Sequence, residues 1–332
     1  MASPTVYKWT DPGAPQINRA DVADYIALFQ AVLIDGYGTK TPPVSGANKW
    51  TIPFSDGTSF ILKQGGTQAR KTCIKIGPFN SSGYYAEMEC AVDYTDLNTP
   101  VDIWAGTTTY DRVGVGYADN TTRNIPWIIF ATERAIYCQF GYINSTAGGN
   151  DTATFDVNAS TTMYNHHWFF GDYTPEDPAI TVNQCVSFSN YSLLGQFYSY
   201  SLPYANAEGY GKKRCAGNAG NVTGEFKCIP MFSRAIDEGA VSAGGQRTDA
   251  NDARYPNLVN GGLYLDKVKF ISERVIMGEF PGLLFPIQSR PFPINGIIHE
   301  IDGSGDYAGE KLYVFGTFDG QYFLRDGDWG VD

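Results

Sequence analysis

The sequence predicts a mainly β protein with antiparallel, sandwich-like sheets, one N-terminal α-helix and long Gly-rich loops. The chain has 332 residues, enough for a sizeable core, and 14% of them are aromatic. Its 37 glycines and 18 prolines divide the apolar residues into short runs bounded by turns, which is typical of strands. Residues 18–38 alone show the three- and four-residue apolar spacing of a helix.

An extended N-terminal arm, residues 1–17, precedes this helix. The arm contains Trp9, Pro12 and Pro15, and no strand partner for it is apparent nearby in the sequence. An arm with an exposed Trp usually docks on its own domain or on a neighbour. Trp9, Pro12 and Pro15 are therefore candidate interface residues.

The predicted helix carries one apolar stripe, which needs a sheet or a neighbouring subunit to cover it. The stripe comprises Val22, Tyr25, Ile26, Phe29, Val32 and Leu33. Asn18 suits the N-cap, and Asp21 suits the partly positive first turn. We expect the helix to end at Asp35-Gly36-Tyr37-Gly38, where Gly36 can adopt a left-handed conformation.

Strands are predicted from residue 49 onward. Residues 60–62 follow a Ser-Asp-Gly turn signal, and residues 127–130 and 135–140 flank a polar turn, which indicates a hairpin whose first strand is buried on both faces. Residues 86–94 alternate most clearly between apolar and acidic side chains. The residues expected to face the core are Ala86, Met88, Cys90, Val92 and Tyr94, and those expected on an acidic outer face are Glu87, Glu89 and Asp93.

Later strands are predicted as two groups. Residues 186–194 and 196–204 read as a pair of strands, and strands resume in the last third at residues 263–270 and 275–277. Pro281, Pro291 and Pro293 are expected to break up the apolar segment that follows. Residues 311–324 are expected to form a closing hairpin with a type I′ turn at Asp319-Gly320.

Three regions follow from this pattern: an arm and helix at 1–45, a β domain at 46–204, and a second β region with long loops at 205–332. Residues 205–227 and 236–262 are Gly- and Ala-rich and long for ordinary connections. Tyr210, Phe226, Phe232 and Arg247 belong to residue types that anchor interfaces, so they are further interface candidates. The stretch is either ordered by assembly or folded against its own domain.

Charge and composition exclude several classes of protein. The net charge of −11 argues against a nucleic-acid partner, which needs clustered Lys and Arg. No stretch approaches the roughly 20 apolar residues of a membrane-spanning helix. Residues 1–9 lack the order of a secretory signal, so we expect a soluble protein made in the cytoplasm. The six cysteines form no CxxC pair, which argues against zinc, and Cys215 and Cys228 are the disulfide candidates.

The candidate reactive groups all have simpler explanations, so we predict no catalytic, cofactor or metal residue and no enzyme activity. Packing beside Trp168 is favoured over a ligand role for His166-His167, because adjacent strand residues point to opposite faces. The acidic residues 300–310 depart from calcium-loop spacing, so a solvated turn is favoured over calcium. Glu87 and Glu89 are more simply a wet surface than a glycosidase pair.

Short motifs along most of the chain are similar to those of one protein family. The most specific is the arm from Lys8-Trp9 through Pro12-Gly13-Ala14-Pro15, together with the helix that ends in Asp35-Gly36-Tyr37-Gly38. The others are Lys49-Trp50-Thr51, Pro53-Phe54-Ser55-Asp56-Gly57, Pro126-Trp127-Ile128-Ile129, Phe169-Phe170-Gly171-Asp172, Met277-Gly278-Glu279-Phe280-Pro281-Gly282-Leu283, and the order from Gly303 and Gly305 through Ala308-Gly309 to Leu312-Tyr313-Val314. In these motifs the chain resembles a family of tailed-bacteriophage virion proteins.

This resemblance implies a structural component of the virion, with no catalytic residues to carry over. It favours a tail or baseplate position, with copies of the chain and other virion structural proteins as partners. One alternative is a capsid decoration or neck protein. Another is a carbohydrate-binding or glycan-cleaving tail protein, with the aromatic segment near Trp168 as a sugar platform; full burial of Trp168 and His167 would exclude that platform.

Overall fold

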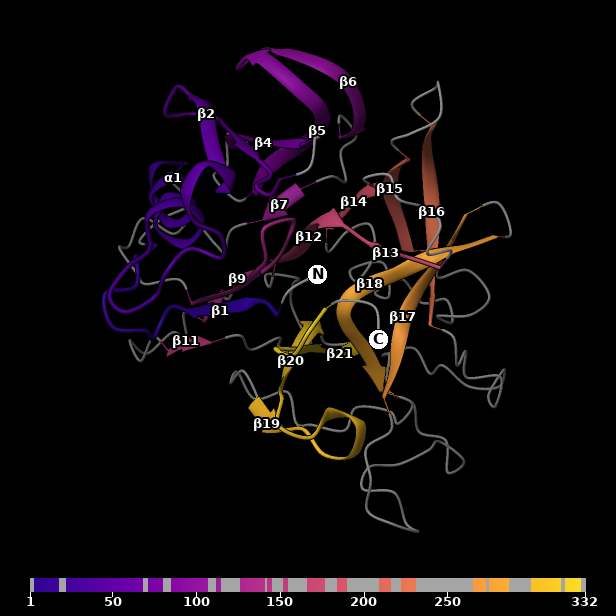
Figure 1. Ribbon diagram of the computed structural model, residues 1–332. Coiled ribbons are helices and arrows are strands. Elements are labelled where there is room, and N and C mark those ends of the chain that lie inside the picture. The colour runs from indigo at the N-terminus through magenta and orange to yellow at the C-terminus, as the bar shows by residue number, and fades with distance from the viewer. Residues whose placement is uncertain are drawn as a thin grey trace.

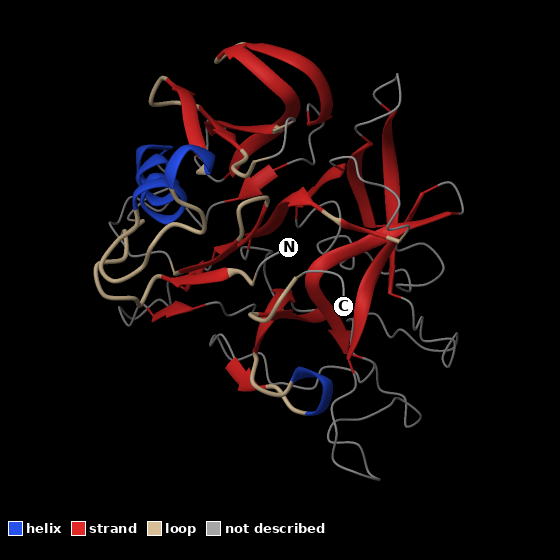
Figure 2. Cartoon of the chain, viewed as in Figure 1, coloured by secondary structure: helices blue, strands red, loops and turns tan. Residues whose placement is uncertain are grey.

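The computed structural model describes residues 3–17, 22–67, 71–79, 85–106, 112–114, 126–140, 142–144, 152–154, 166–176, 184–189, 209–215, 222–230, 265–272, 275–286, 300–317 and 320–329. Strands account for 53% of the interpretable residues, arranged in three antiparallel sheets with one helix of 14 residues (Figure 2). The prediction of a mainly β, antiparallel protein with one N-terminal helix is therefore confirmed.

A 13-stranded antiparallel sheet runs through most of the chain (Figure 1). Its strands, in spatial order, are β1 (Thr5–Lys8), β8 (Trp127–Ala131), β9 (Ala135–Phe140), β12 (His166–Asp172), β14 (Gln184–Ser189), β15 (Gly209–Cys215), β16 (Val222–Pro230), β17 (Leu265–Ser272), β18 (Val275–Pro286), β21 (Gly320–Arg325), β20 (Lys311–Thr317) and β19 (Glu300–Asp302), with β13 (Thr174–Pro175) paired to β18. The sheet continues across the expected boundary at 204/205, so the two expected β regions share it.

A six-stranded sheet lies beside it. Its order is β2 (Thr51–Ser55), β3 (Phe60–Lys63), β4 (Cys73–Phe79), β5 (Tyr85–Asp96) and β6 (Thr99–Gly106), and β7 (Arg112–Gly114) also pairs with β5. The remaining elements are the small sheet of β10 (Tyr142–Asn144) and β11 (Thr152–Thr154), the helix α1 (Val22–Gln30) with its π-helical extension Ala31–Asp35, and the 3-10 turns Gly46–Asn48 and Gly305–Tyr307.

The main core fills the space between the two sheets and α1. Phe29 on the helix lies 5.9 Å from the ring of Phe60 in the six-stranded sheet and 5.8 Å from the ring of Trp168 in the larger one. Both sheets contribute alternate residues to this core, namely Phe60, Leu62, Ile74, Ile76, Met88 and Cys90 from the smaller sheet and Ile129, Ile136, Cys138, Phe140, Trp168 and Phe170 from the larger. The apolar stripe of the helix is therefore covered within the chain.

The stripe is close to the prediction. Its buried members are Val22, Tyr25, Leu28, Phe29, Val32 and Leu33, so Leu28 replaces Ile26, which is only partly buried. Gly36 has the expected positive φ of 83°, but its ψ of 171° is extended rather than helical. The reason is that the chain turns back at once, with the Tyr37 N–H donating to the Lys40 carbonyl at 3.0 Å. The expected cap residues Asn18 and Asp21 lie outside the described residues.

The 13-stranded sheet curls until its two ends meet. Phe130 on β8 lies 5.1 Å from the ring of Tyr313 on β20, and Phe169 on β12 lies 5.5 Å from the ring of Phe280 on β18. Tyr137 on β9 contacts Trp329, which follows β21, at 5.3 Å. These aromatic rings form a second core inside the curl, on the face of the sheet opposite the main core.

The predicted hairpin at β8 and β9 is confirmed, and all residues of both strands are buried. The closing hairpin of β20 and β21 is also present, but Gly320 belongs to β21 and pairs with Thr317 rather than lying in the turn, and Asp319 lies outside the described residues. Pro281 does not end a strand. It lies within β18 where the pairing with β17 is irregular, which is a position that tolerates a missing N–H.

β5 confirms the strand predicted at 86–94, but its two faces differ from the prediction. Met88 and Cys90 belong to the main core as expected. Tyr94 instead joins an apolar cluster on the outer face with Ile61, Cys73 and Ala91. The register between β5 and β6 is irregular at Cys90/Ala91 and at Tyr94/Asp96, and such bulges re-aim side chains. The Tyr94 hydroxyl donates to Glu89 Oε1 at 2.8 Å, so the outer face is not simply acidic.

The Gly-rich residues 205–227 are not one long loop, because β15 and β16 occupy much of them. Their register runs from Gly209 opposite Cys228 to Cys215 opposite Val222. The two candidate cysteines thus lie at opposite ends of the hairpin, roughly 20 Å apart at the rise of a strand. A disulfide needs Cα atoms within about 7 Å, so this structure excludes the Cys215–Cys228 bond. The expected strand at 196–204 and the stretch 236–262 lie outside the described residues.

Candidate functional site

The arm forms one unit with the end of the helix, and it has a strand partner in its own chain. β1 pairs antiparallel with β8, from Thr5 opposite Ala131 to Lys8 opposite Ile128, and Tyr7 is fully buried. The partner lies far along the sequence, so the arm docks on its own domain, which is one of the two expected outcomes. Tyr37 OH donates to Asp11 Oδ2 at 2.9 Å, which joins the helix end to the arm.

The arm and the end of the helix, which together carry the most specific part of the resemblance, meet at this contact. Gly38 has a φ of 54°, and a Cβ on it would lie 2.1 Å from the carbonyl oxygen of Pro12. Trp127 Nε1 donates to the carbonyl of Pro15 at 3.0 Å, and the Trp9 N–H donates to the carbonyl of Trp127 at 3.0 Å. The arm, the helix end and β8 therefore hold one another in place.

The predicted interface residues separate into three groups. On the arm, Pro12 is exposed, whereas Trp9 and Pro15 are partly buried. Tyr210 and Phe226 lie on the paired strands β15 and β16 but are not opposite one another, because Tyr210 is opposite Lys227 and Gly211 is opposite Phe226. Phe232 and Arg247 lie outside the described residues. The role of all these residues at an interface stays a prediction.

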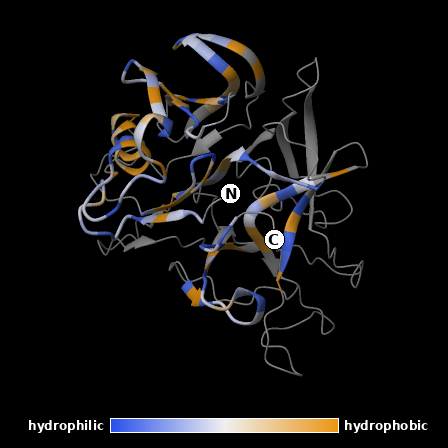
Figure 3. Cartoon of the chain, in the orientation of Figure 1, coloured by the Kyte–Doolittle hydropathy of each residue, from blue (hydrophilic) through white to orange (hydrophobic). Residues whose placement is uncertain are grey.

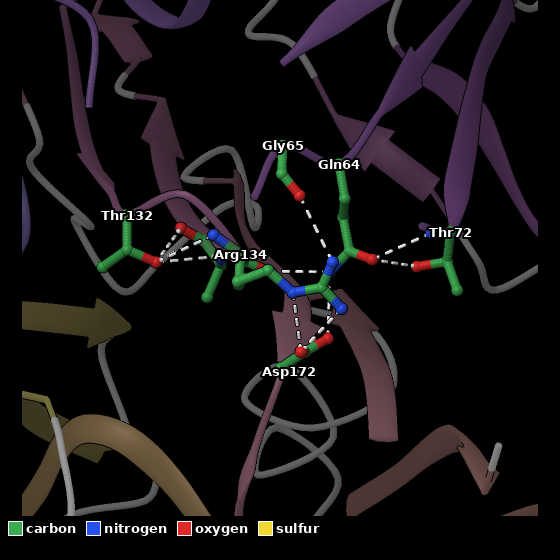
Figure 4. A network of polar contacts seen from close by, with 7 residues as sticks. Gln64, Gly65, Thr72, Thr132, Arg134 and Asp172 are labelled. Atoms are coloured by element: carbon green, nitrogen blue, oxygen red, sulfur yellow. Dashed lines mark hydrogen bonds and ion pairs between the residues drawn. The ribbon is translucent and has the colours of Figure 1, made fainter. Parts of the chain in front are cut away.

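A buried polar network joins the two sheets (Figure 4). Arg134, in the turn between β8 and β9, donates from Nε to Asp172 Oδ2 on β12 at 2.8 Å and from Nη1 to the Gly65 carbonyl at 3.2 Å. Gln64, which follows β3, donates from Nε2 to the Arg134 carbonyl at 2.7 Å and to Asp172 Oδ1 at 3.1 Å. Thr72 completes the network by donating from its N–H and hydroxyl to Gln64 Oε1.

Glycines permit the close approach of these segments. Gly66 has a φ of 87°, and a Cβ on it would lie 2.8 Å from Arg134 Cδ. A Cβ on Gly171 would lie 2.4 Å from the Cα of Ala135. Trp50 Nε1 adds a second link between the sheets by donating to the Thr132 carbonyl at 2.9 Å.

The electrostatics of this network suit a structural joint. Arg134 is 1% exposed and Asp172 is 8% exposed. Burial raises the pKa of Asp172, and the charge and hydrogen bonds of Arg134 oppose that rise. Each charged group has its partner inside the protein, which is what a buried ion pair requires. Sequence reasoning missed the network because its members come from three distant segments.

A second charged cluster closes the curl of the 13-stranded sheet at the surface. Glu300 on β19 accepts hydrogen bonds from Lys8 on β1, at 2.5 Å, and from Lys311 on β20. Lys8 Nζ also lies 4.8 Å from the ring centroid of Tyr313. The hydrogen bonds from Lys311 and Lys8 lower the pKa of Glu300. This cluster links strands from the two ends of the chain.

The remaining chemical candidates are placed as follows. Trp168 is 0% exposed, so it cannot serve as a sugar platform. His166 and His167 lie on β12, opposite Phe140 and Gln139. Among the residues that the structure describes, no three His, Cys, Asp or Glu side chains are grouped as a metal site. No helix in this part of the chain has the length and apolar character to cross a membrane.

Motif residues of the resemblance thus lie where elements meet. Besides the arm, they include Trp50, which donates to the Thr132 carbonyl, and Asp172, which accepts from Arg134. They also include Gly282, on which a Cβ would lie 2.0 Å from Trp329 Nε1. Comparison of the chain with models of known protein families and with curated proteins gives no match.

Proposed function

We propose that this chain is a structural component of a tailed bacteriophage particle, in the tail or baseplate, where it acts through contacts with copies of itself and with other virion structural proteins. One observation carries the proposal. The residues through which the sequence resembles phage virion proteins form the joints that fix the shape of the body, such as Trp127 on Pro15 and Asp172 on Arg134. A structural subunit of an assembly needs residues that fix its shape.

The construction of the body supports this role. Two aromatic cores, one between the sheets and one inside the curl, share β8, β9 and β12. The strands between the cores are buried on both faces, which makes the centre of the protein rigid. A rigid body that presents fixed surfaces can repeat the same contacts in every copy of an assembly.

The proposed role includes no enzyme activity, no cofactor, no nucleic-acid partner and no membrane insertion. A glycan contact is not favoured at the aromatic segment, because Trp168 is buried between the sheets. A capsid decoration or neck position stays an alternative outcome of the test below.

Localisation in the particle tests the proposal. An epitope inserted at the exposed turn Gly46–Asn48, where a Cβ on Gly46 would meet nothing within 4 Å, should leave the fold intact. Purified particles that carry the tagged chain are then labelled with antibody and viewed by electron microscopy. We expect label on the tail or baseplate. Label on the capsid or neck would contradict the position, and absence of the chain from purified particles would contradict the function.

A further inference from the structure

The strands β19, β20 and β21 belong to a C-terminal unit that comprises residues 300–317 and 320–329 (Figure 1). One side of this unit is firmly anchored to the rest of the sheet. There β21 pairs with β18, where Leu324 lies opposite Leu283. Trp329, which is buried, lies 5.3 Å from the ring of Tyr137 on β9. This side is therefore held by a backbone ladder and by buried side chains.

The other side of the unit meets β1 at a seam that has no backbone ladder. Among the described strands, β19 pairs only with β20 and β1 pairs only with β8. The free edge of β1 is already occupied by its own chain. The Lys8 N–H donates to Asp11 Oδ2 at 2.8 Å, and the Lys8 carbonyl accepts from the Asp11 N–H at 3.0 Å. The Val6 carbonyl accepts from Lys40 Nζ at 2.7 Å. These backbone groups are not available to β19.

Side chains cross the seam instead. Glu300 on β19 accepts hydrogen bonds from Lys8 on β1, at 2.5 Å, and from Lys311 on β20. Behind this contact, Phe130 on β8 packs 5.1 Å from the ring of Tyr313 on β20. Lys8 and Glu300 are each 29% exposed, so solvent ions reach the contact. The two sides of the unit thus differ in strength, because a partly exposed ion pair contributes little.

The C-terminal unit also has a small core that is separate from the main core. Leu312 and Phe323 are buried in a cluster with Leu284 of β18, on the anchored side. Among the described residues, the main core draws on positions between Tyr7 and Phe170 and on none in the unit. Figure 3 shows hydrophobic and hydrophilic residues close together on this unit. Movement of the unit at the seam therefore leaves the main core intact.

We propose that the C-terminal unit is a flap, which turns about its ladder with β18 and opens at the seam while the main core stays folded, and that Glu300 is the latch that keeps it closed. Opening separates Phe130 from Tyr313 and exposes apolar ring surface to water, so the closed state is favoured. Salt weakens the latch, because it screens the attraction between Glu300 and the two lysines. The flap is a property of the folded chain alone. It goes beyond the proposed function and does not rest on it.

Hydrogen exchange of the full chain, followed by mass spectrometry of its peptides, tests the flap because it measures the opening of each segment separately. Relative to their intrinsic rates, amides of residues 300–317 should exchange at least about tenfold faster than those of the fully buried strands β8 and β9. Glu300→Gln keeps the size of the side chain and removes its charge, so it should speed exchange in 300–317 about two- to fivefold. High salt should speed this exchange in the unaltered chain, and much less in Glu300→Gln.

Ile76→Val is the matched control in the main core. Ile76 is fully buried there, and the loss of one methyl group should speed exchange in β8 and β9 about two- to tenfold. The same variant should leave exchange in residues 300–317 unchanged, because the main core is intact whether the flap is closed or open. Glu300→Gln and Ile76→Val therefore distinguish opening of the flap from unfolding of the whole chain.

Equal relative exchange rates in 300–317 and in β8 and β9 of the unaltered chain would overturn the flap, since the unit would then open only with the whole body. Equal acceleration of both segments by Ile76→Val would overturn it for the same reason. If Glu300→Gln leaves exchange in 300–317 unchanged, Glu300 is not the latch. The proposed function is judged separately, because absence of the chain from purified particles would contradict that function and leave the flap standing.

Discussion

Lys8 and Glu300 hold together the first and last strands of the 13-stranded sheet, with Nζ 2.5 Å from Oε2 across 292 positions of sequence. β1 has β8 as its strand partner and β19 has β20, so in the described structure side chains rather than a backbone ladder join the two ends. Behind the pair, Phe130 packs edge-on against Tyr313. The surface ion pair therefore lies over an aromatic contact that excludes water.

The first prediction concerns this ion pair. Glu300→Gln should lower the free energy of unfolding by at most about 1 kcal/mol, because partly exposed pairs contribute little. Lys8 and Glu300 are each 29% exposed, so the loss should shrink at high salt. Urea unfolding at low and high salt measures both effects. Asp302→Asn is the control, because Asp302 is 92% exposed and lies 3.8 Å from Lys311. An equal loss in both variants would contradict a specific role for Glu300.

The pH dependence of this contribution has a definite sign. The folded-state pKa of Glu300 is lowered from its ordinary value of 4.5, first by the hydrogen bond from Lys311 and then by that from Lys8. The stabilisation is therefore fully present above pH 4.5 and is lost as the pH falls through the folded-state pKa. The difference in stability between the unaltered chain and Glu300→Gln should be constant near neutral pH and decline in acid. A difference that grows in acid would contradict the assignment.

The second prediction concerns the buried joint. Arg134→Ala should cost about 3–5 kcal/mol, because it leaves Asp172 buried without its cation. Urea unfolding followed by circular dichroism gives the loss directly. The double variant Arg134→Met with Asp172→Leu should recover much of that loss, since replacing a buried pair with apolar groups is often neutral. A double variant less stable than Arg134→Ala would show that the hydrogen bonds of Gln64 and Gly65 matter more than the charges.

Local sequence patterns predicted the helix and the strands better than they predicted which distant segments those elements contact. The β8–β9 hairpin follows from two adjacent apolar runs and a polar turn, and the helix follows from its stripe. The partner of the arm and the Gln64–Arg134–Asp172 network could not be predicted, because they join segments far apart in sequence. The strands β15 and β16 were missed because glycines disfavour strands in isolation, whereas here β14 and β17 pair with them on both sides.

The third prediction compares alanine substitutions at two glycines with positive φ, one of which adds a steric clash to the cost of backbone strain. Gly309 has a φ of 90°, and a Cβ on it would meet nothing within 4 Å, whereas at Gly282, with a φ of 67°, a Cβ would lie 2.0 Å from Trp329 Nε1. Gly309→Ala should cost about 1–2 kcal/mol from the backbone alone. Gly282→Ala should cost a further 1–3 kcal/mol or so, because Trp329 is buried and cannot move aside freely. Thermal unfolding of both variants checks the order, and equal losses would contradict the clash.

The helix stripe gives a fourth prediction. Phe29→Asp places a charge between Phe60 and Trp168, where Phe29 is fully buried. An unpaired charge there should cost several kcal/mol, so we expect insoluble or poorly folded protein. Ala27→Asp, at an exposed position of the same helix, should stay soluble with a nearly unchanged melting temperature. A soluble Phe29→Asp variant with the melting temperature of the unaltered chain would mean that the stripe is not buried in the isolated subunit.

The last prediction concerns deletion of the N-terminal arm, which we expect to impair folding of the chain. Removing residues 1–15 would delete β1, expose the edge of β8 and leave Trp127 Nε1 without the Pro15 carbonyl. Lys40 would also lose its hydrogen bond to the Val6 carbonyl. The truncated chain should therefore be insoluble or unfold at much lower urea.

Two single substitutions within the arm separate folding from assembly. Tyr7→Ala should cost about 3–5 kcal/mol, because Tyr7 is fully buried beside Tyr37 and its hydroxyl donates to the Thr41 carbonyl. Pro12→Ala, at an exposed position, should change the free energy of unfolding by less than about 0.5 kcal/mol. If Pro12→Ala folds normally but enters particles poorly, the exposed tip of the arm contacts a neighbour. If Tyr7→Ala is as stable as the unaltered chain, the docking of β1 on β8 is not part of the folded subunit.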